Sequence, residues 1–313
     1  MWCARGLFVV LALWTASAQV AVQPRAKPPE TARETRAVPN LRVDTSLVLI
    51  PVTVNDPLNR PVAGLEKENF KVFDDKVEQT ITQFAMDDEP IAVGLVFDTS
   101  GSMGAKLSRS RMAAAEFFRL SNPEDEYFLV EFDNAPRLAV PLTRDTGSIQ
   151  TELMFTQSHG STALLDAIYL ALHEMKKSKQ HKKALLVISD GGDNHSRYTA
   201  SEVGTVVIES DVLIYSVGVF GGMSSAEEFE GPALLRKLSE HTGGRMFEAS
   251  AVELPDIAKH IGIDLRNRYV LGYAPSNQQR DGHYHRVEVK VLPPRGLPKL
   301  KAYWRTGYYA PVD

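Results

Sequence analysis

The chain has 313 residues and a formal net charge of −4, with 43% hydrophobic and 24% charged residues. This is the composition of an ordinary soluble globular protein, long enough for about two domains. The charge gives no reason to expect binding to nucleic acid or to an anionic membrane surface, and the single cysteine, Cys3, excludes an intrachain disulfide.

The first 18 residues have the pattern of a secretory signal peptide. Arg5 precedes an apolar run from Leu7 to Trp14, and Ala16-Ser17-Ala18 follows as a cleavage site of the A-x-A type. The alternative, a membrane anchor, needs about 20 apolar residues, more than this run offers. We therefore expect cleavage after Ala18 and an exported protein, periplasmic or secreted, without a stable membrane span.

Residues 19–40 are rich in proline, alanine and charge, and this composition predicts a disordered linker. Residues 41–89 have the pattern of short strands and form the N-terminal β segment. VDTSLVLIPVTVND alternates and then meets the turn PLNRPVAG, whereas NFKVFDDKVEQTITQFAMDD predicts two strands around an Asp-Asp-Lys turn.

Residues 90–268 alternate between strands and helices. In chain order we expect a buried strand IAVGLVFD, a helix SRSRMAAAEFFRLSN, strands EYFLVEF and PRLAVPLT, a helix TALLDAIYLALHEMKKS, a strand KALLVISD, a helix TASEVGTVVIES, a strand DVLIYSVGV, a helix PALLRKLSEHTGG, a short strand RMFEA and a helix VELPDIAKHIGIDLRNR. Such alternation predicts an α/β fold with a doubly wound, mostly parallel sheet. PRLAVPLT follows a tight turn and is expected as an antiparallel edge strand.

Residues 269–313 return to strands, in YVLGYAPS, HYHRVEVKVLPP and LKAYWRTGYYAP. They form the C-terminal β segment. Because neither β segment is expected to be stable as an independent fold, we expect the two to meet in one small β-sandwich.

Three oxygen-rich segments fall at strand ends or at a helix start within the α/β part. They are Asp98-Thr99-Ser100-Gly101-Ser102, Gly160-Ser161-Thr162 and Asp190-Gly191-Gly192-Asp193. Ligands of open α/β sheets bind outside the carboxyl ends of the strands, so these segments predict a binding site. We expect Asp98 to point into solvent there, so that its removal costs no stability.

The pattern D-x-S-x-S with a distant threonine and aspartate resembles the von Willebrand factor type A domain and its metal-ion-dependent adhesion site. The five matching positions, which we predict as metal ligands, are Asp98, Ser100, Ser102, Thr162 and Asp190. The resemblance covers about 180 residues and implies a Rossmann-like fold. The flanks PVAGLEKENFKVFDD, YVLGYAP and RTGYYAP are similar to exported proteins of acidobacterial type that contain this domain. The family further implies a partner protein whose Glu or Asp completes the coordination of the ion.

The chemistry of these residues supports the same site. Carboxylates and hydroxyls are hard ligands that suit Mg²⁺, Mn²⁺ or Ca²⁺. Two carboxylates about cancel the charge of a divalent ion, and five ligands leave a position for water or for a partner's carboxylate. We expect direct bonds from the hydroxyls, with one or both aspartates acting through water.

Each of these residues also has a purely structural interpretation. Ser100 and Ser102 could cap the first helix, and Thr162 the long one, while Asp98 and Asp190 could be turn residues. For Asp133, Asp193 and Asn194 we favour turn or loop roles over ligation. His283 and His285 would share one face of a strand, which allows zinc binding but offers no third ligand.

The leading hypothesis is an exported, metal-dependent protein-binding or adhesion module without catalytic activity. One alternative is a scaffold subunit of an envelope assembly that uses mainly the β-sandwich. Another is a metal-assisted hydrolase, but GSMGAKLS lacks the glycine spacing of a phosphate loop, and neither a nucleophile elbow nor a general base accompanies the metal set.

Overall fold

The computed structural model describes residues 47–87, 89–220, 226–249 and 253–312. The predicted signal peptide and linker lie outside the described residues. The α/β part begins with β5 (Ile91–Asp98) and ends with α6 (Leu254–Arg266). Strands before and after it form two further sheets.

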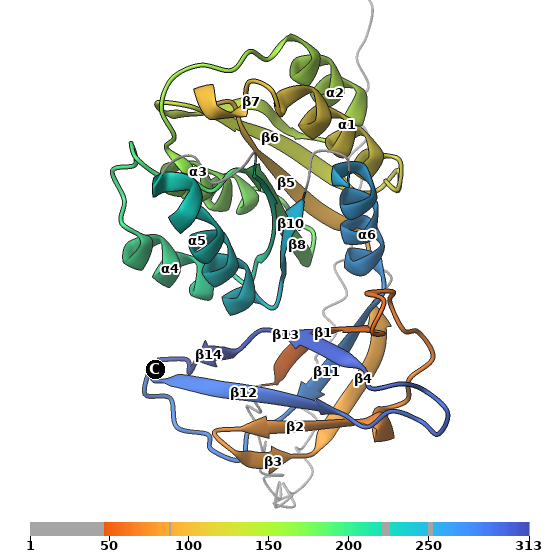
Figure 1. Cartoon of the computed structure of the whole chain (residues 1–313). Helices are drawn as coiled ribbons and strands as arrows, with labels where there is room; N and C mark the ends of the chain where they lie inside the picture. The colour runs from red at the N-terminus through yellow and green to blue at the C-terminus, as the bar shows by residue number, and fades with distance from the viewer. Residues whose placement is uncertain (1–46, 88, 221–225, 250–252, 313) are drawn as a thin grey trace, which may run out of the picture. The chain divides into compact units, whose positions relative to one another are not determined.

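The α/β part is built on one six-stranded sheet with the strand order β10-β9-β8-β5-β6-β7 (Figure 1). The strands beside β5 are β6 (Glu126–Phe132), β7 (Pro136–Thr143), β8 (Lys182–Ser189), β9 (Leu213–Val219) and β10 (Met246–Ala249). All neighbouring pairs are parallel except β6 and β7. The sheet is thus mixed, and the expected antiparallel edge strand is present.

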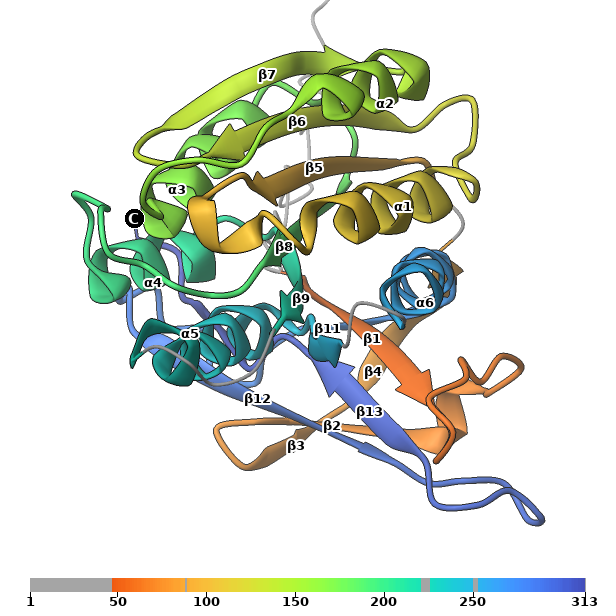
Figure 2. The same ribbon diagram turned by 45° about the horizontal axis from the view of Figure 1, so that its top comes forward.

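Six helices cover both faces of this sheet (Figure 2). They are α1 (Leu107–Phe118), α2 (Thr146–Phe155), α3 (Leu164–Met175), α4 (Ala200–Glu209), α5 (Ala226–Thr242) and α6. One apolar cluster contains side chains of α1, α2 and α6, and a second contains side chains of α3, α4 and α5. Every residue of β5 is buried, because apolar residues on both of its faces meet helices.

Two helices differ from the sequence expectation. No helix was predicted at α2, because only Ile149 and Leu153 give its sequence TGSIQTELMF a buried side; Asp145 caps it by accepting from the N–H of Gly147 at 2.9 Å. Helix α5 was expected to start at Pro232, whereas Pro232 lies inside it. Proline is common in the first turn of a helix, so Pro232 was a plausible first residue for this helix, but the prediction was wrong.

The remaining strands pair the two β segments with each other. The N-terminal strands are β1 (Val48–Asn55), β2 (Phe70–Asp74), β3 (Val77–Gln79) and β4 (Ile81–Asp87); the C-terminal strands are β11 (Arg268–Tyr273), β12 (Tyr284–Val291), β13 (Lys301–Trp304) and β14 (Gly307–Tyr309). One sheet has the order β13-β1-β11-β4, the other β14-β12-β2-β3. Buried residues of both sheets form one apolar cluster.

The strand count in these segments corrects two expectations. The sequence predicts one strand after the Asp-Asp-Lys turn and one in LKAYWRTGYYAP, but the chain changes sheets at Thr80 and again at Arg305-Thr306. Strand pairing is a non-local property. The alternation of side chains between the two faces of a strand can continue where the chain passes from one sheet to the other, so this pattern does not reveal the change of sheet. The α/β part connects β4 to β11, which are neighbours with Asp87 opposite Arg268.

Candidate metal centre

Asp98, the last residue of β5, is completely buried. The N–H of Ser100 donates to its Oδ1 at 2.9 Å, and the hydroxyl of Ser189 donates to its Oδ2 at 2.5 Å. The expectation that Asp98 points into solvent is therefore wrong. Helices on both faces and the loops at the strand ends cover this position, so truncation to alanine leaves two buried donors unpaired.

Burial also changes the acid–base chemistry of Asp98. Loss of hydration is the largest cause, and the neighbouring negative charge of Asp190 is the second; together they raise the pKa of Asp98 to about 6. Hydrogen bonds from Ser100 and Ser189 act in the opposite direction but are outweighed. A buried carboxylate whose ionised form is disfavoured in this way gains from a nearby cation.

Of the two serines, Ser100 directly precedes a short 3-10 helix, Gly101–Met103, and Ser102 lies within it. Their hydroxyl oxygens lie 3.1 Å apart. Ser100 makes no side-chain capping hydrogen bond at this helix, and the residue at the cap position of α1 is Lys106. The helix-capping interpretation of the serines is therefore wrong for Ser100 and unsupported for Ser102, and both hydroxyls remain candidate ligands.

Thr162 is also buried and lies just before α3. Its N–H donates to Oδ1 of Asn194 at 2.9 Å, and its carbonyl accepts from the N–H groups of Asn194 and His195. The residue at the cap position of α3 is Ala163. Thr162 is therefore held by the loop that follows Asp190 rather than serving as the helix cap.

Asp190 follows β8 and is 2% exposed. Its Oδ2 accepts from the ammonium group of Lys106 at 3.0 Å. The backbone after it is tightly packed: Gly191 has φ +80°, and a Cβ on Gly231 of α5 would lie 2.6 Å from the carbonyl oxygen of Asp190. Two glycines thus allow helix and loop to approach closely enough to position this carboxylate.

Backbone hydrogen bonds connect the three loops. The N–H of Gly101 donates to the carbonyl of Gly160 at 3.1 Å, and the N–H of His159 donates to that of Thr99 at 2.8 Å. Asn194 adds its bond to Thr162. The loops are thus fixed relative to one another, which limits the reorganisation that an incoming ion would require.

Asp133 and Asp193 have the loop roles expected of them. Oδ1 of Asp133 accepts from the N–H of Ala135 in the hairpin between β6 and β7. Oδ1 of Asp193 accepts from the hydroxyl of Ser196 at 2.5 Å and from the N–H of Leu165.

Sequence reasoning missed three residues of this site: Lys106, Ser189 and Asn194. Ser189 had a detectable signal, because a polar residue directly precedes Asp190 at the end of an otherwise apolar strand. Lys106 lies within GSMGAKLS, which was considered only as a failed phosphate loop. Asn194 acts through a backbone contact that no spacing rule predicts.

The donor set fits a hard divalent cation. Two carboxylates and three hydroxyls are oxygen ligands of the kind that Mg²⁺ takes, usually with several waters retained. The repulsion between Asp98 and Asp190 is the structural observation that a cation would relieve. The residues that would hold it are the predicted five, with Ser189, Asn194 and Lys106 around them.

Comparison with known proteins agrees with this architecture. Residues 93–192 match the family model of the von Willebrand factor type A domain. A von Willebrand factor type A domain is thus supported for the α/β part of the chain. The solved structure of a von Willebrand factor type A protein from Catenulispora acidiphila has a TM-score of 0.51 at 12% identity, covering 87% of this chain and 75% of that one.

Two further proteins are similar to part of the chain. An uncharacterized protein of Borreliella burgdorferi is 27% identical over an alignment of 180 residues. The match covers 50% of this chain and 53% of that relative, so it spans about half of the relative's length. The corresponding domain of the type V pilus tip protein Mfa5 from Porphyromonas gingivalis matches with a TM-score of 0.47 at 12% identity, covering 58% of this chain and 98% of that one. The similarity to the solved structures concerns the fold alone.

Among the described helices, none combines the length and the apolar character needed to cross a bilayer.

Proposed function

We propose that the chain is an exported, metal-dependent protein-binding module. Asp98, Ser100, Ser102, Thr162 and Asp190 would hold Mg²⁺, with Mn²⁺ or Ca²⁺ as substitutes, and a Glu or Asp of a partner protein would complete the coordination. The two β segments would form one β-sandwich that carries this domain. The module would not be an enzyme, since the sequence places neither a nucleophile elbow nor a phosphate loop beside the metal set.

The observation that carries the proposal is the pair of buried carboxylates at the strand ends. Asp98 and Asp190 are 0% and 2% exposed, and the negative charge of Asp190 adds to burial in raising the pKa of Asp98. Ordinary turn residues would face water, where such repulsion is weak. Buried beside the Ser100 hydroxyl, the pair is instead suited to a divalent ion.

Lys106 explains why the partner would be acidic. A divalent cation with two carboxylates is neutral, and the ammonium of Lys106, 3.0 Å from Asp190, makes the assembly +1. An anionic ligand is attracted to such a centre, and a carboxylate oxygen is also a hard ligand for the vacant coordination position.

Metal binding is tested by melting the protein with and without Mg²⁺. At about 100 times the Kd, a ligand stabilises the folded state by roughly 2.7 kcal/mol. Asp98→Asn is the informative variant, because the amide can still accept from the N–H of Ser100 and donate to a reversed Ser189 hydroxyl. We expect it to fold and to lose the Mg²⁺ effect.

Asp145→Ala is the matched control. It removes the cap of α2 and costs about 1 kcal/mol of stability, but no predicted ligand changes, so its Mg²⁺ effect should equal that of the wild type. A wild-type protein without any metal-induced shift, or an Asp98→Asn variant that keeps the full shift, overturns the proposed metal site.

Partner binding is tested by capture from envelope extract in Mg²⁺ and in chelator. The proposal expects partners that are lost with chelator and with Asp98→Asn. Partners retained under both conditions would instead favour the scaffold function that uses the β-sandwich.

A further inference from the structure

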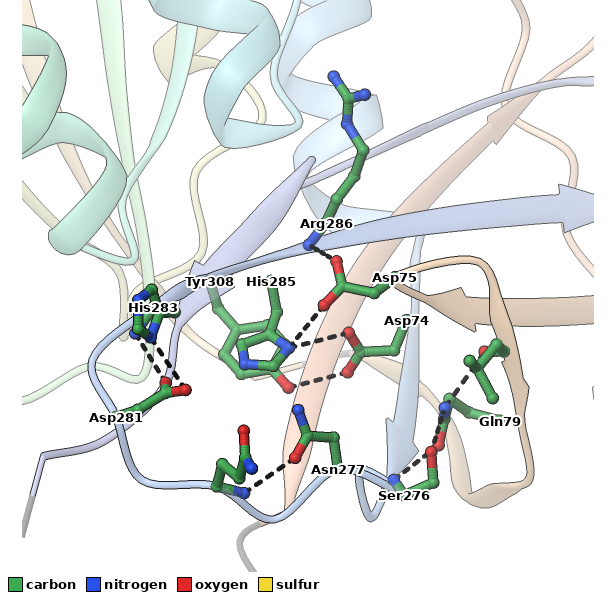
Figure 3. A network of polar contacts seen from close by, with 12 residues as sticks. Asp74, Asp75, Gln79, Ser276, Asn277, Asp281, His283, His285, Arg286 and Tyr308 are labelled. Carbon is green, nitrogen blue, oxygen red and sulfur yellow. Dashed lines mark hydrogen bonds and ion pairs between the residues drawn. The ribbon is translucent and has the colours of Figure 1, made fainter.

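A second cluster of ligating side chains lies in the two β segments, outside the α/β part (Figure 3). Asp74 ends β2, Asp75 begins the turn to β3, and His285 lies on β12, which pairs with β2. One ligand atom from each of the three lies within 4.8 Å of the others. Nδ1 of His285 is 3.5 Å from Oδ1 of Asp74 and 3.0 Å from Oδ2 of Asp75.

Asp74 shows why this cluster is more than a surface accumulation of charge. The residue is 6% exposed, and its Oδ2 accepts from the hydroxyls of Tyr273 and Tyr308 at 3.0 and 2.8 Å. Its Oδ1 is buried and, among the described residues, receives no hydrogen bond. A buried carboxylate oxygen without a donor is costly, and this one is directed toward His285.

The other groups hold the three ligands in place. Oδ1 of Asp75 accepts from the N–H of Arg286 at 3.0 Å, which leaves Oδ2 toward the imidazole. The Tyr308 ring stacks on that of His285, with centroids 5.3 Å apart and planes at 15°. The phenol hydroxyls of Tyr273 and Tyr308 fix the other oxygen of Asp74, and such outer contacts are typical of metal sites.

We propose that Asp74, Asp75 and His285 form a second metal site, which binds a divalent transition cation such as Zn²⁺. Ligands bonded to tetrahedral Zn²⁺ at about 2.0–2.2 Å lie about 3.4 Å apart, close to the separations seen here. Two carboxylates and a neutral imidazole balance the charge of the ion. The Asp75 side chain is 54% exposed, so a fourth position is open to water.

This set differs from the pair that the sequence indicated. His283 is exposed and contacts Asp281, with Nδ1 2.9 Å from Oδ2, so it does not join His285. The missing ligands come instead from β2 and its turn, about 210 positions earlier in the chain.

A metal at this cluster would connect the N-terminal and C-terminal β segments. The chain has one cysteine and so no intrachain disulfide, and a metal bond between residues 75 and 285 would close a loop that contains the whole α/β part. Closing a long loop lowers the entropy of the unfolded chain, and metal binding to a folded site adds directly to folding stability.

The test is calorimetric titration of the purified protein, without a polyhistidine tag, with Zn²⁺ in saturating Mg²⁺. We expect one equivalent of Zn²⁺ to bind and to raise the melting temperature. His285→Gln should abolish this binding, and Asp75→Asn should weaken it more than tenfold, because an amide is a poor zinc ligand.

His283→Ala is the matched control, since it removes a neighbouring exposed histidine and should leave Zn²⁺ binding unchanged. If His285→Gln fails to fold, Asp75→Asn decides, because Asp75 is on an exposed turn. Three results would each overturn the proposal. They are a folded Asp75→Asn variant that binds Zn²⁺ as tightly as the wild type, a His283→Ala variant that no longer binds Zn²⁺, and a wild-type protein that binds no Zn²⁺. None of these outcomes depends on whether Mg²⁺ binds at Asp98.

Discussion

The two acidic clusters of this protein are assembled in different ways. The cluster around Asp98 and Asp190 lies at the ends of two adjacent parallel strands, β5 and β8, and consists of oxygen ligands together with one lysine. The cluster of Asp74, Asp75 and His285 lies across the antiparallel pair β2 and β12 and includes a nitrogen ligand. The two clusters should therefore prefer different metals because their ligand types differ. Mg²⁺ should prefer the first cluster and Zn²⁺ the second.

The comparison also shows two ways to satisfy a buried carboxylate. Asp190 has an ammonium partner, so the metal-free state is partly compensated. Asp74 has two phenol donors on one oxygen and none on the other. A cation would thus compete with Lys106 at the first cluster, whereas at the second it would fill a position that lacks a donor.

The largest effect should come from Lys106→Met. Removing one partner of a buried ion pair typically costs about 3–5 kcal/mol, here because Oδ2 of Asp190 loses the ammonium group that lies 3.0 Å from it. Denaturant unfolding should show this loss without metal, and Mg²⁺ should restore more stability than in the wild type. An unchanged Mg²⁺ effect would show that Lys106 and the ion do not share Asp190.

Gly191→Ala should disrupt the first cluster without altering a ligand. At φ +80° the new side chain is strained and would contact the backbone of Gly231 at 2.7 Å, so we expect a loss of about 2–3 kcal/mol. The Mg²⁺ effect should fall while Zn²⁺ binding is kept. Gly64→Ala is a suitable control, with a similar φ of +79° but open space around it, and it should leave both metal responses intact.

The Mg²⁺ effect at the first cluster should depend on pH. The folded-state pKa of Asp98, about 6, is above its ordinary value of 3.8, so this group makes the metal-free protein less stable as pH rises from about 4 to 6. Below pH 6 an ion must displace the proton, and the Mg²⁺ effect should decrease by about 1.4 kcal/mol per pH unit. Melting curves between pH 5 and 7.5 test this; a constant Mg²⁺ effect would contradict ligation by Asp98.

The smallest effect should come from Tyr308→Phe at the second cluster. It removes one donor to Oδ2 of Asp74 while the Tyr273 hydroxyl remains. Loss of such an outer contact lowers metal affinity by about tenfold or more, measurable by Zn²⁺ titration. The Mg²⁺ effect should not change, and if it does, the two clusters are coupled.

The proximity of Asp98 and Asp190 was predictable because both residues follow a rule of the fold. Strand ends of a parallel sheet converge at one edge, so Asp98 and Asp190 could be placed together from the positions of their strands. The burial of Asp98 was missed, since it depends on how the loops after β5 and β8 fold over the strand ends, where the Ser189 hydroxyl reaches its carboxylate. Such packing has no signature in a single strand pattern.

The second cluster was beyond sequence reasoning for a different reason. His285 was noted, but its partners depend on the pairing of β12 with β2, and register between strands about 210 residues apart is not encoded in local alternation. The same limit explains the undetected changes of sheet at Thr80 and after Trp304. The α/β order itself was predictable, because each buried strand and amphipathic helix is a local pattern.

The central claim is that the oxygen-rich edge of the central sheet binds a divalent cation, and crystals grown with Mn²⁺ test it most directly. The anomalous scattering of Mn²⁺ would locate the ion independently of its coordination geometry. The account predicts a peak in contact with the Ser100 and Ser102 hydroxyls, with Asp190 bound directly or through water and the Lys106 ammonium displaced from its carboxylate. The account would be contradicted if Mn²⁺ were fully occupied at another position, while the Lys106–Asp190 ion pair stayed intact and no anomalous peak lay between the hydroxyls of Ser100 and Ser102.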